Sequence, residues 1–241
     1  MARGAGKTVQ YWEQQFTELR REWHALRGDL LTVAGVQRRE VRHSAVIGWL
    51  LDPHAGHGLG TGVLEQFLAL AEIPVTPGDL ASATVALEAG RVTRPGVRKR
   101  KVRADILVRI GSALVVVETK VDDRDRRDQC ASEVASFSKG RASDQTFFVF
   151  LTPDGKPPKH YVSPSEAERF RPVSFRDLSH RLSDLIDGAG LTGRSAGERA
   201  VLSYRDTLTA EFGTARDELD PTTLFYLRNQ TILDTWESAR K

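Results

Sequence analysis

The chain has 241 residues, a formal net charge of +3, 40% hydrophobic and 28% charged residues, and one cysteine. This composition excludes extensive disorder, an intrachain disulfide and a multi-cysteine zinc site, and it predicts that Cys130 is a small buried apolar residue in a reducing compartment. Because no apolar run approaches the ~20 residues that span a bilayer and the N-terminus lacks a signal-peptide core, we expect one cytoplasmic domain, residues 1–241, without membrane association.

The first part of the chain is expected to be helical. Apolar residues at helical spacing predict an amphipathic helix over about 9–30, and a second helix is predicted over 40–51, ending before Pro53. A glycine-rich turn follows through residue 62, and a third helix is expected over 63–71. The apolar residues that define the first helix are Trp12, Phe16, Leu19, Trp23 and Leu26.

The rest of the chain alternates predicted strands and helices, which indicates an α/β fold with a mixed central β-sheet flanked by helices. The core is expected over about 35–185, with a C-terminal helical extension over about 196–241. Besides the central hairpin described next, the predicted elements are an edge strand at 84–87, a helix at 124–137, strands at 146–152 and 171–175, a helix at 176–186 and two helices after residue 196.

A β-hairpin is predicted in the middle of the chain. The segments VRADILVRI and ALVVVETKV flank the Gly-Ser pair at 111–112, the signal for a tight turn between antiparallel strands. We expect Ile110 to pair with Ala113, and opposed Cβ atoms on one face to lie roughly 4.5–5.5 Å apart. This register puts four charged residues on one face, with Asp105 opposite Glu118 and Arg103 opposite Lys120.

Two carboxylates as close as Asp105 and Glu118 repel each other unless a cation lies between them. The run at 114–117 is apolar on both faces and predicts a buried strand, at whose end unpaired charges are costly. A divalent cation with hard oxygen ligands would offset the repulsion and would create a site for phosphoryl chemistry. The alternative is a surface ladder of salt bridges in which Lys120 pairs with Glu118.

A basic segment precedes the hairpin. Residues 91–109 contain eight Arg or Lys and a single acidic residue, Asp105. Such a cluster predicts contacts with the phosphates of a nucleic acid. The alternative is a solvated strand edge that discourages aggregation. The residues that we expect to bind nucleic acid are Arg94, Arg98, Lys99, Arg100, Lys101 and Arg103.

A transition-metal site is an alternative interpretation of Asp52, His54 and His57, because imidazole and carboxylate suit zinc or manganese. These residues lie in a glycine-rich loop rather than on an H-E-x-x-H helix. A structural turn, in which His57 hydrogen-bonds to the backbone, fits the sequence better.

The pattern of Asp105 followed, after a hairpin, by the Glu-Thr-Lys triplet at 118–120 resembles the signature of the PD-(D/E)XK nuclease superfamily. An E-x-x-H-S sequence at 40–44 and a D-P…H-G turn at 52–58 are similar to one bacterial branch of that superfamily. The stretches LTPDGKPP and RPVSFRDLSHRL also resemble that branch, so the resemblance covers about residues 35–185 and implies a restriction-endonuclease-like core.

The resemblance implies a divalent-metal site that binds Mg²⁺, with Mn²⁺ able to substitute. Lys120 would orient the attacking water or stabilise the transition state, and Gln129 would help to orient the site. His43, Ser44 and His57 would be structural or adjacent to the site. Glu40 could instead be a solvated glutamate near a helix start. The implied metal ligands are Asp105, Glu118, Glu40 and the backbone carbonyl of Thr119.

Two departures from the family pattern bear on these roles. Cys130, and Glu133 or Val134, stand where the family has leucine and tyrosine after Gln129, which weakens the role of Gln129. Thr119 replaces an asparagine, a change without consequence for the metal because this side chain points to the opposite face of the strand.

The sequence therefore predicts a Mg²⁺-dependent phosphodiesterase that acts on nucleic acid, DNA rather than RNA, as an endonuclease in defence against foreign DNA. No helix-turn-helix, zinc finger or helicase motif is present to specify a target, so targeting would come from a homodimer or a partner protein. Two alternatives stay open: an RNA-cleaving nuclease, and a binding module that keeps the fold without catalysis.

Overall fold

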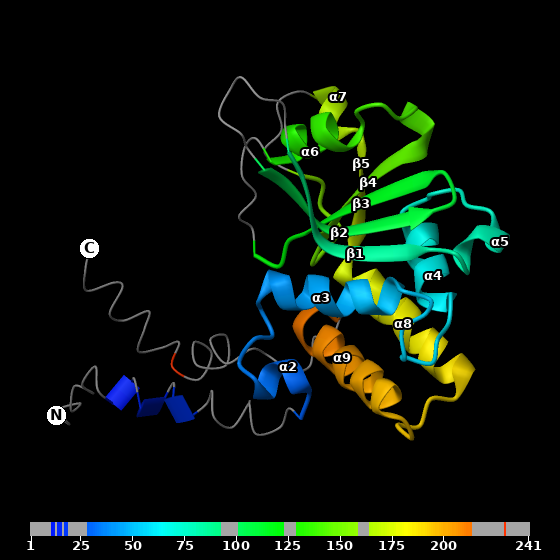
Figure 1. The fold of residues 1–241 in the computed structure, drawn as a ribbon. Coiled ribbons are helices and arrows are strands. Elements are labelled where there is room, and N and C mark those ends of the chain that lie inside the picture. Colours follow the sequence, from blue (N-terminus) through cyan, green and yellow to red (C-terminus); the bar gives the residue numbers. More distant parts are fainter. Residues whose placement is uncertain are drawn as a thin grey trace, which may run out of the picture.

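A mixed β-sheet forms the centre of the fold (Figure 1). Its strands are β1 Thr84–Val92, β2 Lys101–Ile110, β3 Ala113–Thr119, β4 Thr146–Thr152 and β5 Phe170–Ser174. The computed structural model describes residues 11, 12, 14, 15, 17, 18, 28–92, 101–122, 129–158, 164–213 and 229. Within these residues the sheet has five strands in the order β1-β2-β3-β4-β5. β1, β2 and β3 pair antiparallel, whereas β3, β4 and β5 run parallel, which confirms the predicted mixed sheet.

The β2–β3 hairpin has the predicted register. Ile110 pairs with Ala113, and Ile106 pairs with Val117. Gly111 adopts a φ of 53°, a left-handed conformation that glycine tolerates in a tight turn. The apolar run at 114–117 is buried, as expected for a strand that lies in the middle of a sheet with helices on both faces.

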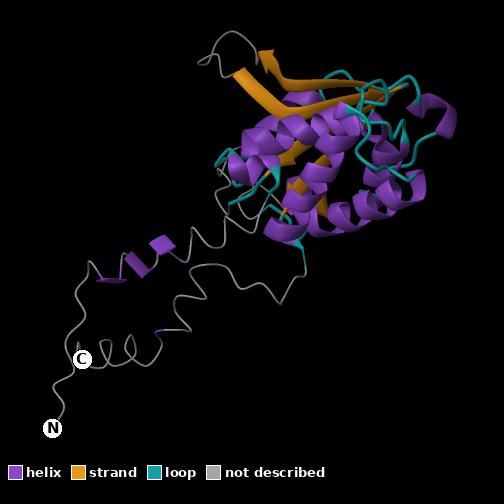
Figure 2. Cartoon of the chain, turned by 90° about the horizontal axis from the view of Figure 1, so that it is seen from below, coloured by secondary structure: helices purple, strands orange, loops and turns teal. Residues whose placement is uncertain are grey.

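Helices cover both faces of the sheet (Figures 1 and 2). One face carries α3 Glu40–Leu51, α4 Gly62–Leu70, α8 Phe175–Ala189 and α9 Ala196–Phe212, and the other carries α6 Gln129–Phe137 and α7 Pro164–Ala167. α6 and α7 lie in the crossover connections from β3 to β4 and from β4 to β5, as parallel strands require. The remaining elements are the short helices α2 Leu30–Val33 and α5 Pro77–Leu80 and a 3₁₀ turn at Ser143–Gln145.

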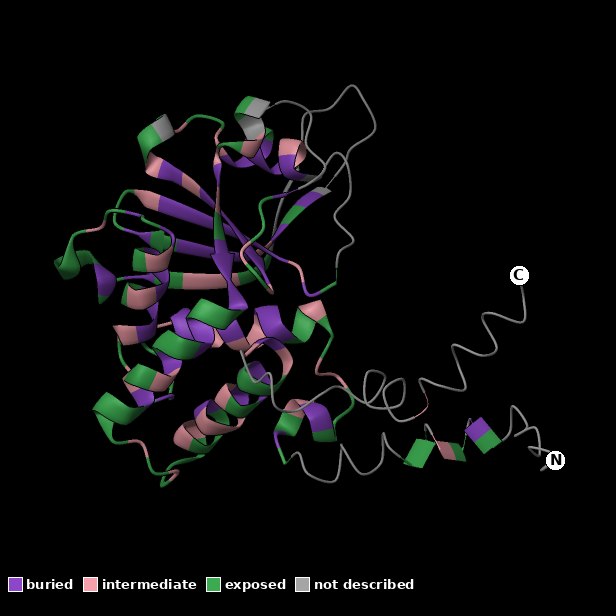
Figure 3. Ribbon diagram, turned by 180° about the vertical axis from the view of Figure 1, so that it is seen from behind, coloured by how far each residue is buried: buried purple, intermediate pink, exposed green. Residues whose placement is uncertain are grey.

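Two apolar clusters lie on the two faces of the sheet. Val117 of β3 packs with Ile47 of α3 in the larger cluster, and Val116 packs with Phe137 of α6 in the smaller cluster. Figure 3 shows the inner strands of the sheet largely buried, whereas the first residues of the edge strand β1 are intermediate or exposed. Both faces of β3 are therefore shielded from water, and only its carboxyl end can present polar groups to a substrate.

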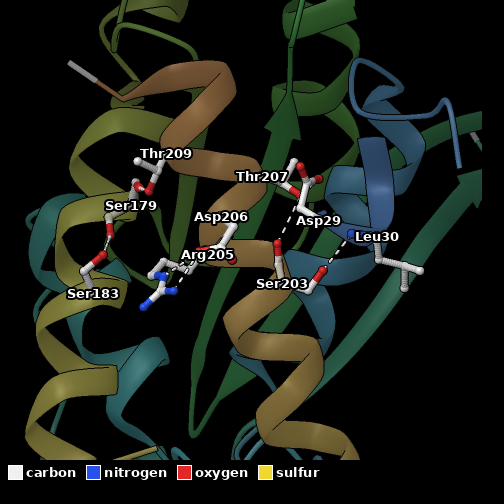
Figure 4. A network of polar contacts seen from close by, with 9 residues as sticks. All are labelled: Asp29, Leu30, Ser179, Ser183, Ser203, Arg205, Asp206, Thr207 and Thr209. Atoms are coloured by element: carbon white, nitrogen blue, oxygen red, sulfur yellow. Dashed lines mark hydrogen bonds and ion pairs between the residues drawn. The ribbon is translucent and has the colours of Figure 1, made fainter. Parts of the chain in front are cut away.

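α2 is fastened to α9 by polar contacts (Figure 4). The side chain of Asp29 caps α2 by accepting a hydrogen bond from the Thr32 backbone N–H at 3.0 Å, and it also accepts one from the Thr207 hydroxyl. The Leu30 N–H donates to Ser203 Oγ at 2.7 Å. The predicted helix over 9–30 is wrong at its end, because Gly28 and Asp29 are not helical and Asp29 starts a separate helix.

The other predicted elements agree with the structure to within a few residues. β1 extends beyond the strand predicted at 84–87. Phe175 begins α8 rather than ending β5, because the Ser174 hydroxyl caps the helix by accepting from the Asp177 N–H. Most of the first predicted helix, the start of the helix at 124–137 and the last predicted helix lie outside the described residues. None of the described helices is both long and apolar enough to cross a bilayer.

Candidate active site

The carboxyl end of β3 delivers two of the predicted site residues. Glu118 and Thr119 are the last residues of the strand, between β2 and β4. The backbone pairing continues to Lys120, whose N–H donates to the Leu151 carbonyl of β4 at 2.8 Å. The main chain of this triplet is therefore held from the β4 side, and its geometry does not depend on a mobile loop.

Asp105 is bound to the same strand end. Its Oδ2 accepts a hydrogen bond from the Thr119 N–H at 2.9 Å, as expected if the register of β2 and β3 continues by one residue to place Asp105 opposite Glu118. Burial raises the pKa of Asp105, against the opposing effects of the Thr119 hydrogen bond and the positive charge of Lys120. The nearby hydrogen bond and positive charge thus do not fully compensate the burial of the Asp105 carboxylate.

Glu118 and Lys120 form a close ion pair. Glu118 is 1% exposed, and Lys120 Nζ lies 2.5 Å from its Oε1. Burial, followed by the charge of Asp105, raises the pKa of Glu118 to about 7 despite the nearby ammonium. Burial by itself would lower the pKa of Lys120, but the surrounding carboxylates, with Glu118 first, raise it. Lys120 therefore stays charged while the carboxylates compete for it.

Glu40 joins the site from the first residue of α3. Its Oε2 lies 3.7 Å from Lys120 Nζ, and its Oε1 accepts a hydrogen bond from the Val121 N–H at 3.3 Å. The structure thus brings Asp105, Glu118, Lys120 and Glu40 together, although β2, β3 and α3 are separate elements. Glu40 contacts the site in this way rather than lying alone on a solvated surface.

Arg38 fixes α3 against the chain that follows Lys120, and the sequence analysis did not identify it. Its guanidinium donates to the Val121 carbonyl at 3.2 Å and pairs with Asp122 at 2.6 Å. A second ion pair, at 3.5 Å, joins Arg38 to Glu211 of α9. In the sequence, only its position two residues before Glu40 could have pointed to a role for Arg38 near the site. Arg38 therefore helps to keep Glu40 beside the triplet at 118–120.

The oxygen atoms of these residues suit a hard divalent cation, but they are not arranged as a complete set of metal ligands. Among the residues that the structure describes, no group of three or more His, Cys, Asp or Glu side chains is arranged to hold a metal ion. The ammonium of Lys120 lies between Glu118 and Glu40 instead. The chemistry fits because a buried carboxyl group with a raised pKa gains from a nearby cation. Asp105, Glu118, Glu40 and the Thr119 carbonyl are the groups that would hold Mg²⁺.

β1 and β2 are distorted together beside Asp105. Ala104 packs in the smaller apolar cluster and Ile106 in the larger one, although residues two apart in a regular strand share a face. Glu88 of β1, which the register places opposite Asp105, has a φ of 48°. Its carboxylate forms an ion pair with Arg103, both side chains being about half exposed. The Arg103 side chain therefore contacts β1, and the β2–β3 register that the structure gives ends before the predicted pair of Arg103 and Lys120.

Four of the six residues predicted to bind nucleic acid lie outside the described residues, namely Arg94, Arg98, Lys99 and Arg100. Lys101 begins β2, on the strand that carries Asp105. The predicted nucleic-acid contacts of these residues stay predictions.

His43 and Ser44 support α3 rather than face the carboxylates. His43 Nε2 donates to the Gln37 carbonyl at 2.7 Å, so its Nδ1 accepts from the Tyr204 hydroxyl at 2.9 Å. Burial lowers the pKa of His43, which favours the neutral ring that this pattern requires. The Ser44 hydroxyl donates to the Glu40 carbonyl at 3.0 Å, within the helix.

The histidine-containing loop after α3 is a backbone-bonded turn. His57 is fully buried, its Nδ1 accepts from the Leu59 N–H at 3.1 Å, and its Nε2 therefore donates to the Asp52 carbonyl at 2.9 Å. Asp52 Oδ1 accepts from the His54 N–H at 3.0 Å. Both ring nitrogens of His57 are occupied, so neither is available to the transition metal considered as an alternative.

The helix after β3 contributes a residue that sequence reasoning passed over. Gln129 is the first residue of α6, and its side chain is not among those described. One turn later, Glu133 is fully buried, and it is near enough to Glu118 to influence the pKa of that carboxyl group. Glu133 could have been identified from its i,i+4 spacing to Gln129, because this spacing places both residues on one face of the helix.

Comparison with protein-family models matches residues 28–205 to the PD-(D/E)XK nuclease superfamily. No match was found among curated proteins or among solved structures. The matched segment contains α3, the β2–β3 hairpin and α6, and with them the Asp105 and Glu-Thr-Lys pattern. It also covers well over half of the chain. The chain therefore belongs to the PD-(D/E)XK nuclease superfamily.

Proposed function

We propose that the protein is a metal-dependent endonuclease that hydrolyses phosphodiester bonds in DNA. The observation that carries the proposal is the convergence of Asp105, Glu118 and Glu40 on the ammonium of Lys120 at the carboxyl end of β3. Buried acidic groups with raised pKa values at one strand end are costly for stability and are typical of catalytic sites. A purely structural salt-bridge ladder would not need Glu118 to be 1% exposed.

Phosphodiester hydrolysis joins a water oxygen to phosphorus and breaks the bond to the leaving sugar oxygen, which takes up a proton. A bound divalent cation supplies charge neutralisation at the phosphoryl oxygens and a more acidic water. Asp105, Glu118 and the Thr119 carbonyl would hold it, and Glu40 would complete the set from α3. Mg²⁺ is the expected ion, and Mn²⁺ the expected substitute, because all four groups offer hard oxygen atoms.

Lys120 acts on the reacting groups and not as a ligand. Its ammonium carries no lone pair, but it is held within reach of both Glu118 and Glu40. From there it can orient the attacking water and stabilise negative charge that builds up on the phosphoryl group.

A nucleic acid is the proposed substrate because the basic segment at 91–109 leads into and overlaps the strand that carries Asp105, and DNA is the polymer that we propose first. The phosphates that flank a cleaved bond would be bound by this segment. Targeting through a homodimer or a partner protein follows from the lack of a sequence-reading motif. Defence against foreign DNA is the biological role that the family analogy favours.

The test incubates the purified protein with closed circular plasmid, linear duplex, single strands and RNA, each with Mg²⁺, Mn²⁺ or EDTA. The proposal expects nicking of the plasmid in either metal and none in EDTA, and expects Asp105→Asn to remove it. If only RNA is cleaved, the substrate is RNA and not DNA. If the plasmid is bound but not cleaved with any of the metals, the protein is a nucleic-acid-binding module without catalysis.

A further inference from the structure

The chain that leaves β3 is in contact with the start of α3. At the end of the strand pairing, the Lys120 N–H donates to the Leu151 carbonyl of β4. The next N–H, that of Val121, donates instead to Glu40 Oε1 of α3 at 3.3 Å. The other oxygen of this carboxylate, Oε2, lies 3.7 Å from the Lys120 ammonium. The orientation of the Glu40 carboxylate is thus tied to the position of the Val121 backbone.

Arg38 holds the carbonyl of the same residue. Its Nη2 donates to the Val121 carbonyl at 3.2 Å and to Asp122 Oδ1 at 2.6 Å. Its Nη1 lies 3.5 Å from Glu211 Oε2 of α9, on a side chain that is 8% exposed. A guanidinium group presents five N–H donors in a fixed fork, so it can hold acceptors from several elements at once. Arg38 therefore joins the Val121 backbone to α9.

Stability alone does not explain this set of contacts. Arg38 and Asp122 are both about half exposed, and ion pairs with such exposure contribute little to the free energy of unfolding. The start of α3 is not fixed by a side-chain cap, because Arg39 at the N-cap makes no such hydrogen bond. Glu40 in the first turn therefore needs other contacts to hold it, and those of Arg38 reach the residue to which Glu40 is bonded.

We propose that Arg38 is a positioning residue, which directs the Glu40 carboxylate to the metal site by holding the Val121 backbone and linking it to α9. The inference rests on the proposed nuclease function. A glutamate side chain has three rotatable bonds, and its terminal torsion is broad, so the ion pair with Lys120 does not by itself fix the carboxyl plane. The Val121 N–H supplies the second contact, and Arg38 keeps this N–H in place.

Two matched substitutions separate this role from an effect of charge. Arg38→Met and Arg39→Met each remove one positive charge near Glu40, and by charge alone each should leave the affinity for Mn²⁺ equal or higher. In calorimetric titration we expect this result for Arg39→Met, because the Arg39 side chain is exposed and makes no cap hydrogen bond. Arg38→Met should instead lose about 10- to 100-fold in affinity, the range for outer partners of metal ligands.

Arg38→Lys keeps the charge but replaces the fork by a single ammonium, so its affinity should lie between those of the parent and Arg38→Met. Parent affinity in Arg38→Met, or an equal loss in Arg39→Met, overturns the inference while the nuclease function stands. If Arg38→Met does not fold, Arg38→Lys decides in the same way. If the parent neither binds Mn²⁺ nor nicks plasmid, the function itself fails.

Amide hydrogen exchange without metal tests the contact itself. In EDTA, Arg38→Met should speed exchange at the Val121 N–H, because its hydrogen bond to Glu40 opens more often. The Lys120 N–H, which is bonded to β4, is the internal control and should keep its protection relative to the rest of the sheet. If protection at Val121 stays at the parent level relative to Lys120, the inference is wrong whatever the protein cleaves.

Discussion

The ammonium of Lys120 lies 2.5 Å from Glu118 Oε1, and the same ammonium is 3.7 Å from Glu40 Oε2. In this arrangement Lys120 supplies the positive charge that the buried carboxylates need. In the proposed mechanism, a divalent cation would compete with this ammonium for the carboxylate oxygens. Among the described residues, no group of three or more His, Cys, Asp or Glu side chains is arranged to hold a metal ion.

Lys120→Met is expected to separate metal binding from hydrolysis. Without the competing ammonium, the affinity for Mn²⁺ should stay the same or increase, whereas the cleavage rate should fall by about 10²–10⁴-fold, the usual loss for one positioned electrostatic or proton-transfer group. Calorimetric titration and plasmid nicking measure the two effects. A variant that cleaves at the parent rate would remove Lys120 from the mechanism.

Thr119→Val serves as the control for Lys120→Met. The Thr119 side chain is fully buried, and its hydroxyl has no hydrogen-bond partner among the described residues. Valine has nearly the same shape, and only the backbone groups of residue 119 are used at the site. Cleavage should therefore be unchanged, and stability unchanged or slightly higher. A larger loss of activity than in Lys120→Met would show that the hairpin register has been misinterpreted.

Asp105→Asn is expected to abolish metal-dependent cleavage and to leave the fold intact. The amide oxygen can still accept the hydrogen bond from the Thr119 N–H, while the charge that raises the pKa of Glu118 is lost. The urea midpoint in EDTA should stay the same or rise, because a like-charge repulsion disappears. Full activity in this variant would exclude Asp105 as a ligand.

The stability of the metal-free protein should fall as the pH rises. Folding raises the pKa of Glu118 from 4.5 to about 7, so the folded protein binds more protons than the unfolded chain between these values. The stability contributed by protonated Glu118 is complete below pH 4.5 and is lost as the pH rises through about 7.

Glu118→Gln cannot ionise at this position and should flatten that pH dependence, leaving the smaller part due to Asp105. Urea unfolding in EDTA at several pH values checks this, with Glu65→Gln as a control that should keep the parent slope. An unchanged slope in Glu118→Gln would mean that Glu118 is not held in a buried environment.

The hairpin could be predicted from the sequence because its signals are local. A Gly-Ser turn and a period of two fix the register, and the register places Asp105 beside the strand end at Glu118. The helix that starts at Glu40 was predicted for the same reason, from its apolar pattern and from Pro53 beyond its end.

The contacts between elements could not be predicted in this way. The burial of Glu133 depends on how α6 packs against the sheet, and a glutamate in a mixed polar helix carries no local sign of burial. The left-handed conformation of Glu88 is imposed by the distortion shared with β2, since a glutamate has no intrinsic preference for it. Likewise, the position of Lys120 between two carboxylates depends on side-chain torsions.

The hydrogen bond between His43 of α3 and Tyr204 of α9 leads to a prediction about stability. His43→Leu removes the partner of the part-buried Gln37 carbonyl and of the buried Tyr204 hydroxyl, which should cost about 2–4 kcal/mol. Tyr204→Phe removes one donor only and should cost about 1–2 kcal/mol. Urea unfolding in EDTA measures both. If His43→Leu instead keeps the parent stability and abolishes cleavage, His43 takes part in the chemistry.

The basic segment at 91–109 is predicted to contact the phosphate backbone of a nucleic acid, and a change in salt dependence tests this. Replacing Arg98, Lys99, Arg100 and Lys101 together with serine should weaken duplex DNA binding and make it less sensitive to salt. Each lost phosphate contact removes roughly 0.9 from the slope of log affinity against log salt concentration. Fluorescence anisotropy at several salt concentrations, with Ca²⁺ in place of Mg²⁺, measures the slope.

Removal of Arg181 on α8 and Arg194 before α9, both exposed, provides the control for net charge. If the segment binds DNA, the loss of slope per charge removed should be much larger at 98–101 than in the control, because contact with phosphates and not total charge releases counterions. Equal effects per charge would mean that the segment is a solvated edge, and the nucleic-acid contacts would then have to come from other surfaces around Asp105.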